Sequence, residues 1–84
     1  MIGKRVRRRT LHRLLPGEYA QLRHGDGSLH WYACTPTGLH CNLSAHDVME
    51  HDDGAITVSP SILVSGGDLG EWHGYLRHGV WQPV

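Results

Sequence analysis

Side chains that could hold a metal ion are spread along the middle and the end of the chain. Thiolates and imidazoles are ligands that suit zinc. Among the two cysteines and eight histidines of the sequence, the candidates are Cys34, His40, Cys41, His46, His51 and His73. Structural zinc sites usually contain close pairs such as Cys-x-x-Cys, but Thr37 stands where the partner of Cys34 would be. On a strand, His40 and Cys41 would point to opposite faces. The spacing therefore favours scattered histidines and two small thiols over a zinc site.

Nucleophilic catalysis would need a serine or cysteine beside a histidine and an acidic residue. Ser59 and Ser61 are available, but no Gly-x-Ser-x-Gly motif surrounds them. The Ser-Pro-Ser string is more typical of a strand irregularity whose hydroxyls bond to backbone groups. The glycines of residues 66–70 lack the lysine and the strand-to-helix context of a phosphate-binding loop. The sequence therefore does not favour an enzyme of either kind.

A basic leader occupies the first 13 residues and contains no acidic residue. Its six cations are Lys4, Arg5, Arg7, Arg8, Arg9 and Arg13. The rest of the chain carries two arginines against eight acidic residues, so the body is acidic. Such a leader could neutralise the phosphates of a nucleic acid, or lie on its own domain or on an acidic partner. The alternative without a function is a solvated terminus, either poorly ordered or forming an edge strand.

Large aromatic side chains are the remaining candidates for binding. Three tryptophans and three tyrosines occur and no phenylalanine, so every large ring carries a polar group. Tryptophan and tyrosine often anchor interfaces, and a domain this small can hardly bury all of them. The candidates for a ligand or partner surface are Trp31, Trp72, His73, Tyr75 and Trp81. For any single tryptophan the better expectation is the core, which should hold at least two of the three.

Alternation of apolar and polar residues predicts short strands joined by glycine turns. Residues 18–23 and 29–34 flank a glycine-rich turn and predict a hairpin, and 39–43 a third strand. Residues 44–50 favour a turn or helical corner leading into a short strand. A strand is predicted over residues 55–58, and Pro60 should limit its pairing. The apolar run 62–64 should be a core segment, and the glycine-rich residues 65–70 should form a mobile loop. Residues 72–76 and 80–82 predict a second hairpin.

The length of 84 residues allows one domain, predicted over residues 14–84 behind the leader of residues 1–13. The strand spacing predicts a mainly β fold, a small antiparallel sheet curled into a barrel or sandwich with at most one short helical turn. No apolar stretch is long enough for a membrane span or a signal peptide. A cytoplasmic location, no membrane contact and free thiols at Cys34 and Cys41 are therefore expected.

Two blocks of sequence resemble an uncharacterised family of small phage and prophage proteins. The first, residues 53–64, contains Val-Ser-Pro-Ser-Ile-Leu, and the second, from residue 72, contains Trp-His-Gly-Tyr-Leu followed by Gly-Val-Trp. The resemblance implies no activity, but it implies a phage-infected or lysogenic bacterial host. Longer relatives carry Cys-x-x-Cys before the first block and a Cys-His pair in the second. In this chain Thr37 and Trp72 replace two of those cysteines, while His40 and His73 keep matching positions.

These observations lead to one expected function and one alternative. We expect a non-enzymatic accessory binding module of phage type, whose target is a host protein, a nucleic acid or a small polar ligand. The alternative is a zinc-binding domain, with a metal-assisted hydrolase-like site built from Cys34, His40, Cys41 and His73. No cofactor is expected under the first hypothesis. An exposed edge strand could also pair two copies of the chain.

Overall fold

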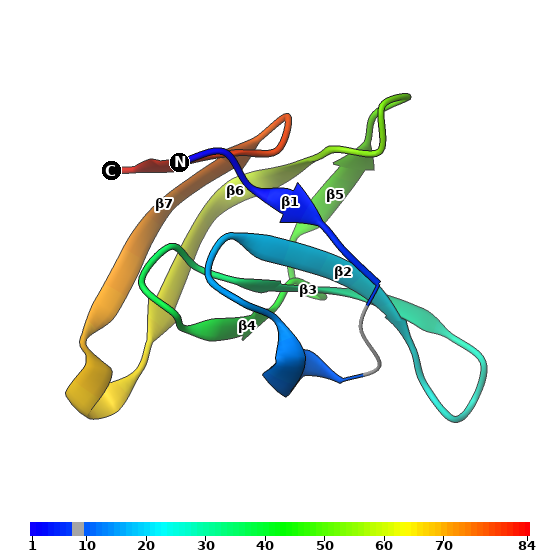
Figure 1. The fold of residues 1–84 in the computed structure, drawn as a ribbon, viewed down its shortest axis with the longest axis horizontal. Helices are drawn as coiled ribbons and strands as arrows, with labels where there is room; N and C mark the ends of the chain where they lie inside the picture. Colours follow the sequence, from blue (N-terminus) through cyan, green and yellow to red (C-terminus); the bar gives the residue numbers. More distant parts are fainter. Residues whose placement is uncertain (8–9) are drawn as a thin grey trace.

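The computed structural model of the chain describes residues 1–7 and 10–84 and shows a mainly β protein (Figure 1). Its strands form two four-stranded sheets, with the orders β1-β2-β3-β4 and β5-β6-β7-β8. The prediction of a mainly β chain is confirmed. A closed barrel, one of the two expected arrangements, is wrong: the ladder ends at β4 and starts again at β5, so neither sheet closes.

The first sheet is mixed rather than purely antiparallel. Its strands are β1 (Lys4–Arg5), β2 (Glu18–Arg23), β3 (Leu29–Cys34) and β4 (His40–Asn42). β1 lies parallel to β2, whereas β2, β3 and β4 pair antiparallel. The β2–β3 hairpin forms as predicted, since Gly27 adopts a φ of 88° in its turn, a conformation that glycine reaches without steric cost.

The second sheet is antiparallel throughout. Its strands are β5 (Asp47–Glu50), β6 (Ile56–Ser65), β7 (Glu71–Arg77) and β8 (Val80–Pro83). The predicted β7–β8 hairpin is confirmed. Residues 44–46 form a turn into β5 and no helical corner. There the backbone N–H of Ser44 donates to the Asn42 side chain at 2.8 Å, and that of His46 to the Leu43 carbonyl at 2.9 Å.

Strand β6 differs from the sequence prediction in two respects. It continues past Pro60 instead of stopping there, because the pairing with β7 shifts: β6 advances four residues from Val58 to Ile62 while β7 advances two. A proline cannot donate a ladder hydrogen bond, and such a bulge accommodates it. The run 62–64 is only partly core, because alternation buries Ile62 but leaves Leu63 59% exposed.

Two 3-10 turns replace the single helical turn that was expected. η1 (Leu11–Arg13) lies in the leader, and η2 (Gly67–Leu69) connects β6 to β7. The glycine-rich segment 65–70, predicted as a loop, is therefore a compact turn, in which the Gly66 N–H donates to the Gly70 carbonyl at 2.7 Å. Within residues 1–7 and 10–84 there is no helix of the length and apolarity that a membrane crossing needs.

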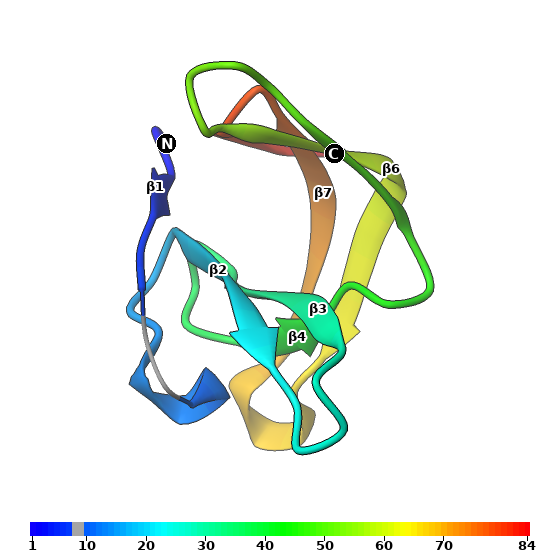
Figure 2. The ribbon, with the colours of Figure 1, turned by 90° about the vertical axis from the view of Figure 1, so that its right-hand side faces the viewer.

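The main hydrophobic cluster lies between the two sheets. Figure 2 shows β6 and β7 along one side of the molecule, with β2, β3 and β4 facing them. The cluster takes Tyr19 and Ala33 from the first sheet and, among others, Ile56, Leu76 and Trp81 from the second. Burying this apolar surface is the largest favourable term in folding, so this contact holds the two sheets together.

The described part of the basic leader is built into the fold. Residues 1–3 join β8, since the Trp81 N–H donates to the Met1 carbonyl at 2.8 Å, and β1 then joins β2. Val6 and Leu11 pack on a second cluster, which covers the other face of the first sheet and contains Leu14, Ala20, Leu22, Tyr32 and Cys34. The leader therefore provides an edge strand and part of a core, and Figure 1 shows its start beside the C-terminus.

Candidate functional site

The residues proposed for zinc do not come together. Cys34 and His40 are paired across β3 and β4, while Cys41 pairs with Ala33 and so points to the opposite face of the sheet. His73 lies on β7 in the other sheet. Among the residues that the structure describes, no group of three or more His, Cys, Asp or Glu side chains could hold a metal ion. The donor set does not fit the zinc alternative.

Both cysteines are free thiols, as predicted. Cys34 is buried in the second cluster, and Cys41 packs against the main cluster. Burial raises the pKa of Cys41 to about 12, because a thiolate there would lose its hydration, and it also raises the pKa of Cys34. Neither thiol is therefore poised as a nucleophile or as a metal ligand near neutral pH.

One serine and one histidine of the predicted sets do meet. The Ser61 hydroxyl lies 3.1 Å from Nε2 of His73, on the exposed side of the β6–β7 pair. A catalytic triad also needs an acidic group that orients the histidine. No carboxylate bonds to His73 in the described part of the chain, and Ser59 is exposed on the irregular part of β6. The contact lacks the third member that nucleophilic catalysis requires.

The tryptophans divide between core and surface. Trp72 and Trp81 are 6% and 1% exposed and pack edge to face at 5.3 Å, which confirms that at least two tryptophans are core residues. Their assignment to a partner surface needs correction, since buried rings cannot reach a ligand. Trp31 is half-buried beneath the Arg5 guanidinium, 4.9 Å from the ring centroid. Tyr75 is half-buried and lies beneath Arg77 at 4.0 Å.

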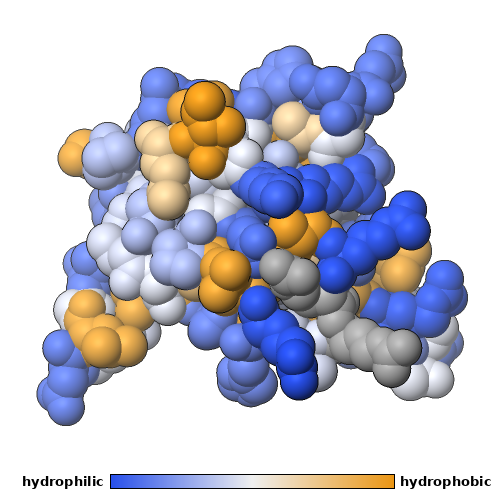
Figure 3. Space-filling model, viewed as in Figure 1, coloured by the Kyte–Doolittle hydropathy of each residue, from blue (hydrophilic) through white to orange (hydrophobic). Residues whose placement is uncertain are grey.

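An open groove with a volume of about 840 Å³ lies on the surface, and three arginines are part of its lining. Arg5 and Arg7 come from the N-terminal segment and Arg23 from the end of β2, while Asp53 and Gly54 close the groove from the β5–β6 turn. Figure 3 shows strongly hydrophilic side chains gathered over β1 and the adjoining part of β2, with apolar atoms exposed between them. Three guanidinium groups from two separate chain segments thus meet at one hollow.

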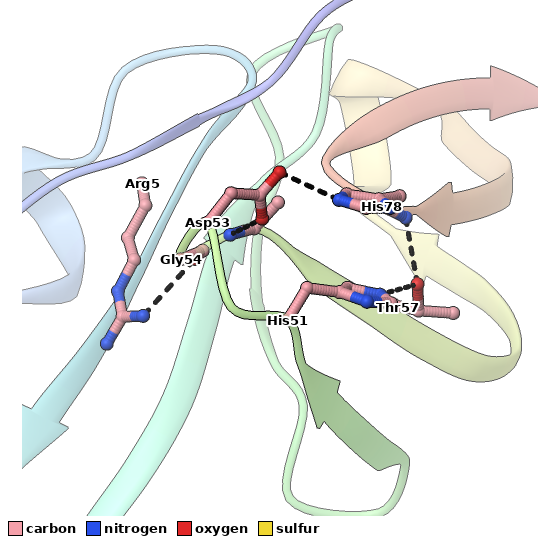
Figure 4. Close-up of polar contacts among 7 residues, drawn as sticks. Arg5, His51, Asp53, Gly54, Thr57 and His78 are labelled. Carbon is pink, nitrogen blue, oxygen red and sulfur yellow. Dashed lines mark hydrogen bonds and ion pairs between the residues drawn. The ribbon is translucent and has the colours of Figure 1, made fainter.

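Arg5 is held in place by three contacts. Its guanidinium forms an ion pair with Glu50 and donates to the Gly54 carbonyl at 3.2 Å (Figure 4), in addition to covering Trp31. These contacts tie β1 to the β5–β6 turn across the two sheets. Because the groove lies between these segments, Arg5 fixes its width.

The turn that carries Asp53 is itself fastened by side-chain hydrogen bonds (Figure 4). One Asp53 oxygen accepts from the Ala55 N–H at 3.0 Å, and the other lies 2.8 Å from Nε2 of His78. The Ala55 bond, followed by the one from His78, lowers the pKa of Asp53. The Thr57 hydroxyl accepts from the His78 N–H at 2.8 Å and lies 2.6 Å from Nε2 of His51, whose ring stacks on His78. The groove therefore has a pre-ordered acidic wall.

The groove includes only part of the predicted cationic set. Arg5 and Arg7 line it, whereas Lys4 and Arg13 do not, and Arg8 and Arg9 lie outside the described residues. Sequence reasoning missed Arg23. The signal was available in the alternation of β2, where Gln21 and Arg23 share one face, but nothing in the sequence brings that face to the leader.

Comparison with known proteins provides no further assignment, since no family model, no curated protein and no solved structure matches this chain.

Proposed function

We propose that this chain is a non-enzymatic binding module whose ligand is a nucleic acid, held by its phosphates in the arginine groove. The observation that carries the proposal is the convergence of Arg5, Arg7 and Arg23 on one hollow. Guanidinium groups bind phosphate oxygens through paired hydrogen bonds and keep their charge at any physiological pH. We also propose that the protein acts in the cytoplasm of a bacterium that carries a phage, as the sequence resemblance implies.

The charge balance supports an anionic ligand. The groove lining contains three arginines and one carboxylate, Asp53, and Glu50 pairs with one of the arginines, so one net positive charge remains. The protein as a whole has a formal net charge of zero, so the groove is a local concentration of positive charge on a neutral molecule. Such a field attracts a polyanion to this face.

The contacts that the groove arginines make within the protein still allow them to bind a phosphate. Arg5 already pairs with Glu50, which balances its charge, so its main role is to shape the groove. Arg7 and Arg23 are exposed, and Arg23 bonds only weakly, at 3.3 Å, to the Gly27 carbonyl. Exposed pairs of this kind contribute little stability, so both side chains can turn toward a phosphate at low cost. They are the residues to test.

The test measures, by fluorescence anisotropy, the binding of a labelled thymidine decamer at several salt concentrations. Arg7 and Arg23 on a single strand give an expected slope of log K against log salt of about −1.4. The double variant Arg7→Gln with Arg23→Gln should bring the slope close to zero and weaken binding. Both positions are exposed, so circular dichroism and the unfolding midpoint should stay unchanged.

The matched control removes the same charge elsewhere. Arg13 lies in η1 and Arg77 on β7, and neither lines the groove. The double variant Arg13→Gln with Arg77→Gln should keep the wild-type slope. Equal losses in the two double variants would show that net charge rather than the groove determines binding. Capture of heparin or of a host protein without any binding of the decamer would reject the nucleic-acid assignment.

A further inference from the structure

A second, smaller pocket lies beside the arginine groove and differs from it in character. It has a volume of about 280 Å³ and is lined mainly by apolar side chains, among them Leu29, Trp31, Leu43 and Val48. Sites for drug-sized ligands usually start at about 300 Å³, so this pocket suits a single small ring system. Within its apolar lining Leu29 is exposed, Trp31 and Val48 are half-buried, and Leu43 is buried.

The two hollows form one continuous surface. Leu29 lines both of them. Arg5 lines the groove and its guanidinium lies over Trp31, which lines the pocket. A ligand that places a phosphate on the arginines therefore has an apolar pocket within reach of its next chemical group. In a nucleic acid, that group is the sugar and its base.

The residues that line the pocket also include His46 and Ser44, which carry polar groups. Nε2 of His46 lies 3.1 Å from the Ser61 carbonyl, which can only accept, so Nε2 carries the proton and Nδ1 of the neutral ring is an acceptor. Among the described residues, Nδ1 is the one buried side-chain nitrogen or oxygen without a hydrogen-bond partner. Ser44 adds a hydroxyl at the rim. Flat apolar contact combined with an unpaired acceptor suits a heterocycle that carries N–H donors.

We infer that this pocket receives one unstacked base of the strand whose phosphates lie in the groove. The inference rests on the proposed function and refines it: the ligand is single-stranded, because the bases of a duplex are stacked and paired and cannot enter a pocket. Trp31 and Leu29 contact the base, and His46 accepts from its edge after a small movement of the wall. Leu29 separates the base from the phosphate.

The experiment compares three ligands on the intact chain by fluorescence anisotropy at one salt concentration. They are a thymidine decamer, an abasic phosphodiester strand of the same length, and a duplex of the same length. Contact between a base and an aromatic ring supports an expected preference of about tenfold for the decamer over the abasic strand. The duplex can bind through its phosphates alone, so its affinity should not depend on Trp31. Fluorescence of Trp31 should change with the decamer alone, since Trp72 and Trp81 are buried.

Variants at two positions locate the effect. Trp31→Leu should bring decamer binding down to the abasic level, and Trp31→Tyr should keep most of the preference. Because Trp31 packs partly on the core, a second variant avoids the question of folding: Ser44 is exposed, and Ser44→Trp should block the pocket from its rim with the same loss. Leu63→Ser, at an exposed apolar position on the other sheet, is the control and should change nothing.

The outcomes separate the two proposals. Equal binding of decamer and abasic strand, with both still sensitive to Arg7→Gln and Arg23→Gln, would overturn the base pocket and leave the groove standing. Absence of binding to either strand would overturn the groove as well. A decamer preference that survives both Trp31→Leu and Ser44→Trp would place the base elsewhere and also reject the inference.

Discussion

Replacing Trp81 with phenylalanine tests how the second sheet is fastened to the first. Trp81 lies on β8 and is 1% exposed, and its indole N–H donates to the Gly17 carbonyl, just before β2, at 2.9 Å. This hydrogen bond crosses between the sheets inside the core. Gly3 lies against it so closely that an added Cβ would be 2.8 Å from both the Gly17 oxygen and the indole nitrogen. Phenylalanine keeps most of the ring but removes the donor.

Two losses add up in the Trp81→Phe variant. The Gly17 carbonyl keeps a second hydrogen bond from the Lys4 N–H at 3.1 Å, so the lost bond costs about 1 kcal/mol rather than the full price of an unpaired group. The smaller ring leaves a cavity, and about 1–1.5 kcal/mol is a fair share of the 3–5 kcal/mol for complete truncation. The total is about 2–2.5 kcal/mol, out of roughly 4–13 kcal/mol expected for a chain of this length.

Urea unfolding followed by tryptophan fluorescence and circular dichroism measures this loss. With a slope near 1 kcal/mol per molar for a small domain, the midpoint should fall by about 2 M. Trp72→Phe is the matched control, because Trp72 contacts the same ring but its indole N–H makes no hydrogen bond within the described residues. That variant should lose only the cavity contribution, about 1 M. Equal midpoint shifts in the two variants would show that the inter-sheet hydrogen bond stabilises nothing.

Three further predictions follow from the fold. Gly74→Ala should strongly lower the unfolding midpoint, because a Cβ there would overlap the Gln82 carbonyl and the adjacent indole, whereas Gly25→Ala, with open space, should be neutral. The free energy of unfolding should fall above pH 9 by about 1.4 kcal/mol per pH unit, because the Cys41 thiol ionises in the unfolded chain but stays protonated in the folded one. Urea unfolding at pH 8 and pH 10 measures this loss, and the Cys41→Ala variant should show a smaller one. Deleting residues 1–13 should unfold the domain, visible by circular dichroism, and a folded, stable truncation would contradict the role of the leader in the second cluster.

The predictable part of the fold is its local hairpins. Residues 18–34 alternate around a turn in which Gly27 needs a positive φ, and residues 72–82 turn at His78 and Gly79, which also have positive φ. Side-chain periodicity and turn chemistry act over a few residues, so they are legible in a single sequence. The sequence also indicated that at least two tryptophans lie in the core, but local patterns could not say which ones, because burial depends on how the strands pack.

The parts that could not be predicted depend on contacts distant in sequence. The parallel pairing of Lys4 with Glu18 joins a segment with no strand pattern to a strand with a clear one, and no local rule selects it. Pro60 predicted an interruption, but the register shift that lets β6 continue is a property of its pairing with β7. For the site, Arg5 and Arg7 were candidates from charge alone. Arg23 joins them only because β1 lies beside β2.

The dependence of the groove on these distant contacts links binding to folding. Arg7, Arg23 and Asp53 reach the groove from three segments, and an unfolded chain would hold them too far apart to share one ligand. A strand that binds only the folded state stabilises it by about 2.7 kcal/mol at a hundred times its Kd. The N-terminal segment would gain most, since it supplies two of the arginines and is held to β8 and β2 by a few backbone hydrogen bonds. The described part of this segment therefore pairs with both sheets and, under the proposed function, would also contribute Arg5 and Arg7 to the ligand site.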